Sequence, residues 1–279
     1  MCATCGCSED GAAVITDVDQ VHEHAHGSED GHGHGHDHDH AGAHGHDHGA
    51  QGTGLDHDGA STTTVSLEQK VLRHNDELAT RAREWLRGRA VLAVNLMSSP
   101  GSGKTTLLEH TARALSPRMA ISVIEGDQET LFDAERIRGA GCRAVQINTG
   151  SGCHLDAEMV TSALHTVDPP NGSLVFIENV GNLVCPALFD LGENRRVVIM
   201  SVTEGEDKPL KYPHMFRAAD LLLLNKIDLL PYLDFDVQRC LGFAHRVNPD
   251  IEVLKISATS GEGLDDWYSW LGALQPSPS

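Results

Sequence analysis

Ala90-Val-Leu-Ala-Val-Asn-Leu-Met97 is an apolar stretch that runs directly into the glycine-rich turn Ser98-Ser-Pro-Gly-Ser-Gly-Lys-Thr105, and the helical pattern TLLEHTARAL follows. A strand, a glycine-rich turn and a helix form the setting of a phosphate-binding loop. In such loops the backbone amides of the turn and of the helix N-terminus cradle phosphates. We therefore expect Lys104 to neutralise the terminal phosphates and the hydroxyl of Thr105 to ligate Mg²⁺.

The residues predicted to contact phosphate belong to the turn and the start of the helix: Gly101, Ser102, Gly103, Lys104, Thr105 and Thr106. The usual pattern, G-x-x-x-x-G-K-[ST], begins with glycine. This chain has Ser98 at that position, while Gly101 and Gly103 keep the rest of the turn flexible. The alternative is a glycine-rich turn that binds nothing, and the flanking strand and helix argue against it.

Outward from this turn, apolar segments alternate with segments that can supply crossover helices. We expect strands at 90–97, 119–124, 142–147, 173–178, 196–202, 220–225 and 251–256. Most of them are apolar throughout, which is typical of strands buried on both faces of a sheet. The sequence therefore predicts an α/β fold with a doubly wound, mainly parallel sheet.

A helix is expected just before the first of these strands, over Ser66–Arg87. Ser66 is the predicted N-cap, and Gln69 would complete a capping box. The predicted apolar stripe of this helix consists of Val71, Leu72, Leu78, Ala82 and Leu86. We expect the globular domain to span 63–279 and to include this helix.

The overall composition excludes several classes of protein. The chain has 279 residues, with 40 acidic and 21 basic side chains and a net charge of −19, which argues against a broad basic face for nucleic acid. No apolar run approaches the roughly 18 residues of a membrane span, and no signal peptide is visible. We expect a cytoplasmic protein without nucleic-acid or membrane partners. Its 7 cysteines are then thiols or metal ligands, not a disulfide framework.

The N-terminal segment differs sharply from the rest. Residues 1–60 contain no Lys or Arg, and 12 of the 18 histidines fall between His22 and His57. Because this segment offers little apolar surface to bury, we expect 8–62 to be a disordered tail. Its alternating histidines are candidate nickel or zinc ligands, and a solvated linker is the alternative. The densest run of them consists of His32, His34, His36, His38 and His40.

A second nucleotide motif indicates which base is bound. Asn225-Lys226-Ile-Asp228 follows an expected strand and matches N-K-x-D, whose carboxylate accepts hydrogen bonds from guanine N1 and the 2-amino group. Adenine lacks that pair of donors, so Asp228 selects GTP over ATP. Ser257-Ala258 follows the next strand and resembles the last guanine-contacting loop of GTPases, although a helix-capping loop has the same pattern.

Two acidic segments, at the ends of the second and fourth expected strands, are candidates for Mg²⁺ binding and for switching. Asp127, in Glu125-Gly-Asp127, would hold Mg²⁺ directly or through water. Glu178, in Glu178-Asn-Val-Gly181, would also hold Mg²⁺ or orient the attacking water, and Gly181 would let a switch backbone approach the γ-phosphate. The alternative for each is a loop acid or a helix cap.

Cysteine clusters form the second theme of the sequence. Cys2, Cys5 and Cys7 lie within six residues and can close around one soft metal ion. A redox pair or a chance cluster of thiols remains an alternative. A second set, Cys153, His154 and Cys185, follows neighbouring strands and is a plausible zinc or nickel site near the nucleotide. We interpret the two other cysteines, Cys142 and Cys240, as small core residues.

These motifs together resemble the HypB family of hydrogenase nickel-incorporation GTPases, over roughly residues 65–275. MCATCGC resembles the family's N-terminal C-x-x-C-G-C nickel motif, and NLMSSPGSGKTTLL resembles its phosphate loop, including the serine at Ser98. EGDQET, GSGCHLDA, ENVGNLVCP and NKIDLLP resemble further family segments. The resemblance implies a P-loop GTPase of the SIMIBI class, with a tight nickel site at Cys2, Cys5 and Cys7 and a weaker nickel or zinc site at Cys153, His154 and Cys185.

The resemblance also implies a GTP-linked homodimer, the nickel chaperone HypA as a partner, and the large subunit of [NiFe]-hydrogenase as the target. The expected activity is GTP hydrolysis with slow turnover, in which Lys104, Asp127 and Glu178 take part. Three rival functions stay open on the residues alone. They are a urease GTPase of the same superfamily, a metal-storage protein in which the GTPase is incidental, and a GTPase chaperone of the cobalamin-enzyme type.

Overall fold

Eight strands form a single sheet in the computed structural model, which describes residues 14–17, 58–127, 132–150 and 152–274, with side chains omitted over 58–68 and 132–135 and at 127. The strand order is β1-β4-β3-β5-β2-β6-β7-β8. The strands are β1 (Val14–Asp17), β2 (Leu92–Ser98), β3 (Ile121–Asp127), β4 (Arg143–Asn148), β5 (Leu174–Glu178), β6 (Arg195–Ser201), β7 (Leu221–Asn225) and β8 (Glu252–Lys255). Every pairing except that of β1 is parallel, which confirms the predicted mainly parallel α/β sheet.

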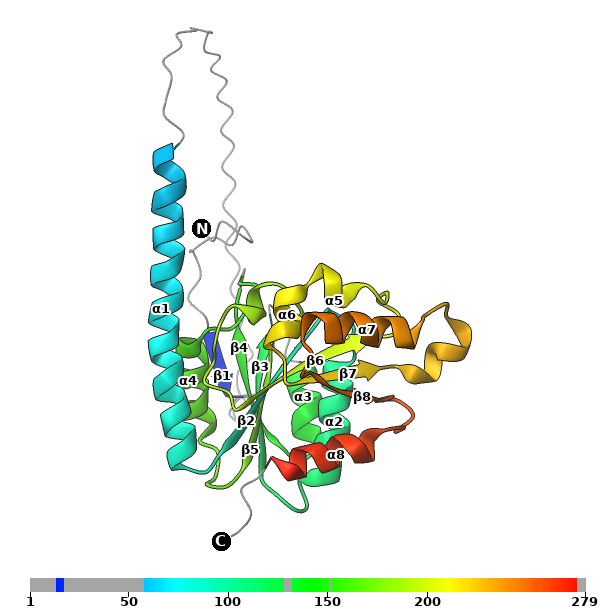
Figure 1. The fold of residues 1–279 in the computed structure, drawn as a ribbon. Helices are drawn as coiled ribbons and strands as arrows, with labels where there is room; N and C mark the ends of the chain where they lie inside the picture. The colour runs from blue at the N-terminus through cyan, green and yellow to red at the C-terminus, as the bar shows by residue number, and fades with distance from the viewer. Residues whose placement is uncertain (1–13, 18–57, 128–131, 151, 275–279) are drawn as a thin grey trace, which may run out of the picture.

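Helices cover both faces of this sheet (Figure 1). Successive side chains of a strand point to opposite faces. Val94 and Leu96 of β2 therefore face one core with Trp267, while Ala93, just before Val94, faces another with Leu86. The elements of the first face are α2 (Lys104–Leu115), α3 (Phe132–Gly139) and α8 (Leu264–Ala273). The second face is covered by α1 (Asp58–Gly88), α4 (Ala157–Val167), α5 (Lys208–Lys211), α6 (Pro213–Ala218) and α7 (Val237–Val247), and two 3₁₀ helices, η1 (Cys185–Ala187) and η2 (Ile227–Tyr232), belong to loops.

The first helix is longer than predicted. It begins at Asp58, so Ser66 lies inside the helix and the predicted N-cap and capping box are wrong. No proline interrupts the preceding residues, and the helix continues through them. In the predicted apolar stripe Ala82 and Leu86 are buried, Leu72 and Leu78 are half-buried, and Val71 is 51% exposed, because the buried face of α1 turns toward α4.

An edge strand also lies within the segment predicted to be disordered. Val14–Asp17 pairs antiparallel with β4, with Ile15 opposite Ile147 and half-buried against the core. Three β-branched residues in succession favour a strand here, although the surrounding sequence is polar. The predicted disorder of 8–62 is therefore wrong for this strand and for 58–62, which belong to α1. Residues 8–13 and 18–57 of that tail lie outside the described residues.

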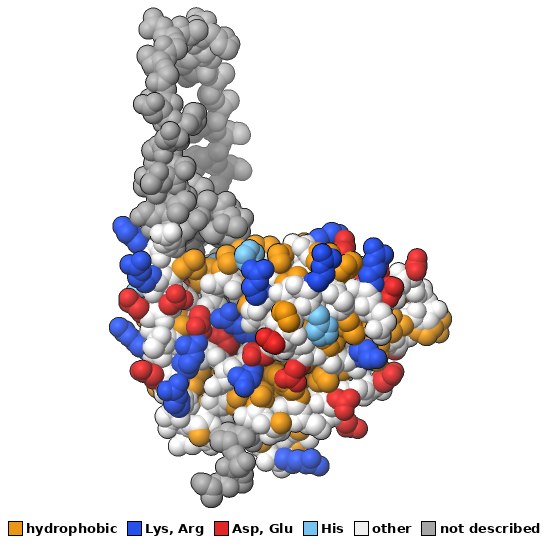
Figure 2. Space-filling view, in the orientation of Figure 1, with side chains coloured by type: hydrophobic (Ala, Val, Ile, Leu, Met, Phe, Trp, Pro, Cys, Tyr) orange, Lys and Arg blue, Asp and Glu red, His pale blue; other side chains and the backbone are white. Residues whose placement is uncertain are grey.

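The described residues also show how charge is distributed on one face and how apolar the helices are. In Figure 2, acidic and basic side chains are interspersed on the visible face, with no continuous basic area. Among the helices of the described chain, none is both long and apolar enough to cross a bilayer.

The two cysteines without neighbouring ligands, Cys142 and Cys240, are buried as predicted, and burial raises the pKa of these thiols to about 11 and about 12 respectively.

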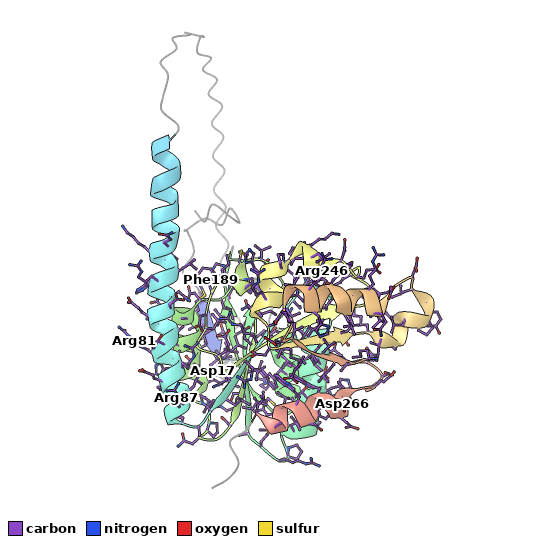
Figure 3. All side chains as sticks on the ribbon, in the orientation of Figure 1. Asp17, Arg81, Arg87, Phe189, Arg246 and Asp266 are labelled. Carbon is purple, nitrogen blue, oxygen red and sulfur yellow. The ribbon has the colours of Figure 1, made fainter. Side chains whose placement is uncertain are left out.

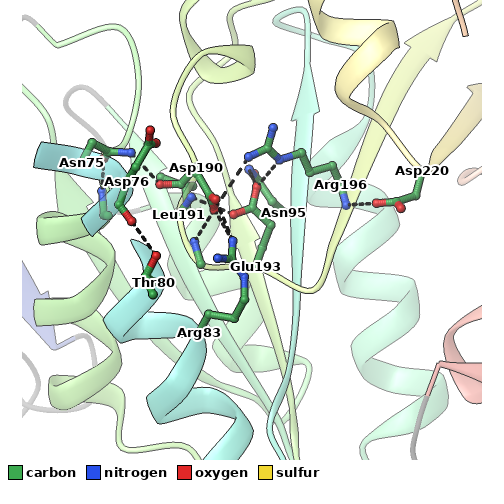
Figure 4. Close-up of polar contacts among 12 residues, drawn as sticks. Asn75, Asp76, Thr80, Arg83, Asn95, Asp190, Leu191, Glu193, Arg196 and Asp220 are labelled. Atoms are coloured by element: carbon green, nitrogen blue, oxygen red, sulfur yellow. Dashed lines mark hydrogen bonds and ion pairs between the residues drawn. The ribbon is translucent and has the colours of Figure 1, made fainter. Parts of the chain in front are cut away.

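A polar network anchors α1 to the loop between η1 and β6 (Figure 4). Asp190 accepts hydrogen bonds from Nη2 of Arg83 at 2.6 and 2.7 Å, and its backbone carbonyl accepts one from Asn75 at 2.8 Å. Burial alone would raise the pKa of the Asp190 carboxyl, but Arg83, the amide of Gly192 and the charge of Arg196 outweigh it and hold this pKa below its usual range. The ionised form of Asp190 is therefore the stabilised form.

We predict that Asp190→Asn lowers the free energy of unfolding at neutral pH by about 1–2 kcal/mol, because the side chain is partly exposed and solvent screens the pair. A carboxyl with a depressed folded-state pKa contributes stability above its unfolded pKa, near 3.9, and loses it as pH falls. The difference from the unsubstituted protein should therefore shrink below about pH 4. Urea unfolding at neutral pH and below about pH 4 measures the two free energies of unfolding. Substitution of the exposed Asp250, Asp250→Asn, is the matched control. A difference that does not change with pH would contradict the assignment.

Candidate functional site

The phosphate loop joins β2 to α2, and Ser98 has a direct role in it. Lys104 Nζ donates a hydrogen bond to Ser98 Oγ at 2.8 Å, and this hydroxyl in turn donates to the carbonyl of Ser99 at 2.6 Å. Both side chains are buried, Lys104 being 9% exposed. The serine at the usual glycine position thus holds the lysine ammonium inside the loop.

A tight contact joins this loop to the base-recognition motif. Gly103 has a left-handed φ of +100°, and a Cβ on it would lie 2.4 Å from Asn225 Nδ2, so only glycine fits there. Asn225 donates to the carbonyl of Ser102 at 2.8 Å and accepts from the amides of Lys226 and Ala258 at 2.8 and 3.0 Å. One asparagine therefore brings together the three segments predicted to hold the nucleotide.

Lys226 and Asp228, the other two residues that define the base motif, follow Asn225 along the chain. Lys226 Nζ donates to the carbonyl of Gly101 at 2.7 Å. Asp228 Oδ1 is buried and has no hydrogen-bond partner among the described residues, which leaves an acceptor for donors such as guanine N1 and the 2-amino group. Ser257 is fully buried, and its hydroxyl accepts from the amide of Ser260 at 3.0 Å, so its side chain shapes the loop.

A cavity of about 550 Å³ opens over the phosphate loop. Its lining comes from the phosphate loop, from the ends of β3 and β5, and from Lys226 and Arg136: Pro100, Gly101, Ser102, Gly103, Lys104, Thr105, Thr106, Glu125, Gly126, Arg136, Glu178, Asn179, Val180, Gly181 and Lys226. This volume is within the usual range for small-molecule sites. A Cβ on Gly181 would lie 3.0 Å from Pro100, so this segment does lie against the phosphate loop, as its sequence suggests.

Three of the residues that line this cavity suit a magnesium ion. Thr105 Oγ1 donates to Glu178 Oε1 at 3.0 Å, and Glu178 and Glu125 are 5% and 3% exposed. Two buried carboxylates and a hydroxyl offer the oxygen ligands that Mg²⁺ prefers. Asp127 ends β3, but its side chain lies outside the description, so its predicted role stays a prediction.

Sequence reasoning missed two of the side chains at this cavity. Arg136 of α3 lines it and is ion-paired with Glu109 of α2 at 2.8 Å. Asn179 lines it directly after Glu178 and is 1% exposed. No short motif marks the arginine, and the asparagine stands within ENVGNLVCP, where only its tertiary contacts reveal a role.

The second predicted metal set converges. Cys153, His154 and Cys185 bring one ligand atom each within 4.8 Å of one another. The two sulfurs are 3.2 Å apart, farther than the roughly 2.05 Å of a disulfide, and both residues are thiols. Two soft sulfurs and one imidazole suit zinc or nickel. Among the described residues they form the one such cluster.

The surroundings of the histidine favour its ligand form. His154 stacks on Phe189, labelled in Figure 3, with ring centroids 4.0 Å apart. Burial lowers the pKa of this imidazole, while the charge of Asp156 opposes that shift. The neutral imidazole that results is the form that binds a metal ion.

The metal cluster and the phosphate cavity share one segment of chain. Glu178, at its start, accepts the bond from Thr105, and Cys185, at its end, contacts Cys153. Between them Asn182 Nδ2 donates to the carbonyl of Cys153 at 3.2 Å. The segment from Glu178 to Cys185 therefore lines the phosphate cavity at one end and belongs to the thiol cluster at the other.

Comparison with known proteins identifies the family. The profile of the CobW/HypB/UreG nucleotide-binding domain matches residues 92–255. The hydrogenase maturation factor HypB of Azotobacter vinelandii is 60% identical over 207 residues, which cover 74% of this chain and 68% of that protein. The chain belongs to the HypB family of hydrogenase maturation factors.

Two solved HypB structures share the fold. HypB from Archaeoglobus fulgidus superposes with a TM-score of 0.69 at 40% identity and covers 73% of this chain and 100% of its own. HypB from Helicobacter pylori, solved in complex with nickel, gives 0.67 at 35% identity, covering 74% and 99%. The resemblance inferred from the motifs is therefore confirmed, and so is the nucleotide-binding fold.

Part of the predicted HypB metal chemistry falls outside the described residues. Cys2, Cys5 and Cys7 lie there, as do the tail histidines His32, His34, His36, His38 and His40. Their metal binding stays a prediction from the sequence.

We predict that Asp228→Asn weakens GTP binding by about 100-fold, the equivalent of roughly 3 kcal/mol for lost charge-assisted hydrogen bonds. Xanthine carries an oxygen where guanine has the 2-amino group, so the amide donor of the variant should bind XTP better than GTP. Competition against a fluorescent GDP analogue measures both affinities, with the exposed Asp250→Asn as control. Unchanged preference for GTP would contradict the assignment of the base site.

Proposed function

We propose that this chain is a GTP-hydrolysing nickel metallochaperone that stores nickel and delivers it to the large subunit of [NiFe]-hydrogenase. The observation that carries the proposal is the segment from Glu178 to Cys185, which begins at the phosphate cavity and ends at the thiol cluster. Nucleotide binding alone needs no thiol cluster at this place, and metal storage alone needs no phosphate loop. Delivery of nickel under the control of GTP uses both.

The nucleotide half of the cycle follows from the cavity. Lys104 neutralises the terminal phosphates, and Asp228 accepts from the guanine. Mg²⁺, held by Thr105 with Glu178 or Asp127, would supply charge neutralisation on the phosphate oxygens. The alternative role of Glu178 is to orient the attacking water. We expect slow hydrolysis, because Arg136 is held in an ion pair with Glu109 and would have to leave it to act on the phosphates.

The metal half uses the cluster of Cys153, His154 and Cys185. Nickel is the cargo of this site, and zinc is a second ion that two thiolates and an imidazole would bind. Three protein ligands leave one position of a four-coordinate ion for water or for a group from a second copy of the chain. The latter supports a homodimer that forms with GTP, and Val184 and Leu188, each 41% exposed beside Cys185, offer apolar surface for it.

Supply and hand-over complete the proposed route. Cys2, Cys5 and Cys7, together with the tail histidines, collect and store nickel, and the nickel chaperone HypA takes part in its transfer to the hydrogenase. We place these steps in the cytoplasm, where thiols stay reduced and available as ligands. The relatives support this route through their common role, since they are hydrogenase maturation factors and one was solved with nickel.

The decisive test is Lys104→Ala in cells that depend on this chain, with hydrogenase and urease activities measured with and without surplus nickel. We predict that hydrogenase activity falls at least tenfold while urease is unchanged, because the variant loses the phosphate-binding ammonium. Recovery in surplus nickel would assign the defect to nickel supply. The exposed Lys211→Ala is a control with the same loss of charge.

The other outcomes identify the rival functions. Normal hydrogenase activity in the Lys104→Ala cells would contradict the proposal. A urease defect alone would instead indicate the sister GTPase of urease maturation. Normal activity of both enzymes, with nickel accumulation preserved, would indicate a storage protein, for which the 12 histidines between His22 and His57 are the supporting observation.

A further inference from the structure

One buried asparagine touches both halves of the proposed switch. Asn179 directly follows Glu178 and is 1% exposed. Its Oδ1 accepts a hydrogen bond from the amide of Leu155, at 3.3 Å, and another from the amide of Val180, at 3.0 Å. Leu155 is the residue after Cys153 and His154. The side chain therefore bonds the loop of two metal ligands to the segment that leads to the third.

The orientation of this side chain is set by a chain of hydrogen bonds that crosses the middle of the sheet. Asn179 Nδ2 donates to Asn95 Oδ1 at 3.5 Å, and Asn95 Nδ2 donates to Glu193 Oε1 at 3.2 Å. Asn95 is fully buried in β2, the strand that leads into the phosphate loop. The contact between Asn95 and Glu193 appears in Figure 4.

We call the hydrogen-bonded chain of Asn179, Asn95 and Glu193 the relay. The carboxylate of Glu193 fixes the direction of every bond in it. Glu193 accepts from Arg196 Nε at 2.5 Å and from the amide of Leu191 at 2.7 Å, and its side chain is 2% exposed. An ionised carboxylate only accepts, so Asn95 must turn its amino group toward it. The oxygen of Asn95 then faces Asn179, so Asn179 must donate to it through its own amino group. The oxygen of Asn179 is thereby left facing two donors, the amide of Leu155 in the metal loop and the amide of Val180.

We propose that Asn179 is the positioning residue that transmits the nucleotide state from Glu178 to the metal ligands, and that Glu193, through Asn95, keeps it in the transmitting orientation. The inference rests on the proposed function and adds the route of its regulation. A nucleotide that moves Glu178 also moves the neighbouring backbone of Asn179. The rigid, buried amide then carries Leu155, and with it Cys153 and His154, relative to Cys185.

A substitution that keeps the shape of Asn179 but changes its donor into an acceptor tests the relay, because each hydrogen bond in the relay depends on which side chain donates. Asn179→Asp keeps the shape but offers no donor to Asn95 Oδ1, so two oxygens would face each other in a buried site. Asn179→Ala removes the same bonds without adding a charge, and it serves if the aspartate variant does not fold. Asn248→Asp and Asn248→Ala are the matched controls. This asparagine donates to the carbonyls of Phe216 and Ala219, at 3.1 and 2.9 Å, and these residues belong neither to the phosphate cavity nor to the thiol cluster.

The readout is the affinity of the thiol cluster for Ni²⁺, measured by sulfur-to-nickel charge-transfer absorption. All variants are made in the full chain with Cys2, Cys5 and Cys7 replaced by serine. Histidine gives no sulfur band, and the thiols of Cys142 and Cys240 are buried, with raised pKa values. The band therefore reports Cys153 and Cys185. Titrations are run with GDP and with a non-hydrolysable GTP analogue, and the ratio of the two dissociation constants is compared.

We expect a ratio of at least fivefold in this background, within the usual range for coupled sites. It should fall below about twofold in the Asn179 variants and stay unchanged in the Asn248 variants. If the Asn179 variants keep the full ratio, the relay is wrong while the proposed function stands. A ratio of one in the background itself would overturn the proposed GTP control of nickel, and the relay with it.

Discussion

The hydrogen bond from Thr105 to Glu178 is the interaction on which the functional architecture depends. It ties the phosphate loop to the segment that ends at Cys185, so a group in the cavity that binds Thr105 competes with this bond. Parallel strands make this arrangement possible, because β2 and β5 are neighbours and both end at the same edge of the sheet. The nucleotide and metal sites are thereby placed on one short piece of chain.

Buried polar groups bond this piece of chain to the rest of the sheet. Asn95, Asn179 and Glu193 are each at most 6% exposed, and an unpaired polar atom among them would cost about 1–3 kcal/mol. A small displacement must therefore break a bond or move the partner, and the metal loop is one of those partners. The same network reaches α1 through the ion pair of Arg83 with Asp190 and the bonds of Asn75 to Asp190 and Ala157. The helix that follows the histidine-rich tail is thus bonded to the first residue of α4, close after the metal loop.

Local patterns were sufficient for the parallel strands and for the motifs, and insufficient for the edge strand and for the relay. Most of the seven parallel strands are largely apolar runs, and Cys153, His154 and Cys185 could be grouped because loops at one sheet edge converge. The edge strand at Val14–Asp17 was missed because three β-branched residues stand in a polar tail. Asn95 and Asn179 were missed because their partners lie 98 and 84 residues away along the chain, a separation that no motif or period records.

The central claim is that nickel and nucleotide are coupled through the segment from Glu178 to Cys185, and thermodynamic coupling must be reciprocal. The most direct measurement is the affinity for GDP and for a GTP analogue with and without Ni²⁺, in the chain whose Cys2, Cys5 and Cys7 are replaced by serine. The account predicts that nickel changes the ratio of the two nucleotide affinities by the same factor by which the nucleotides change nickel affinity. Nucleotide affinities that stay the same while nickel occupies Cys153 and Cys185 would contradict it.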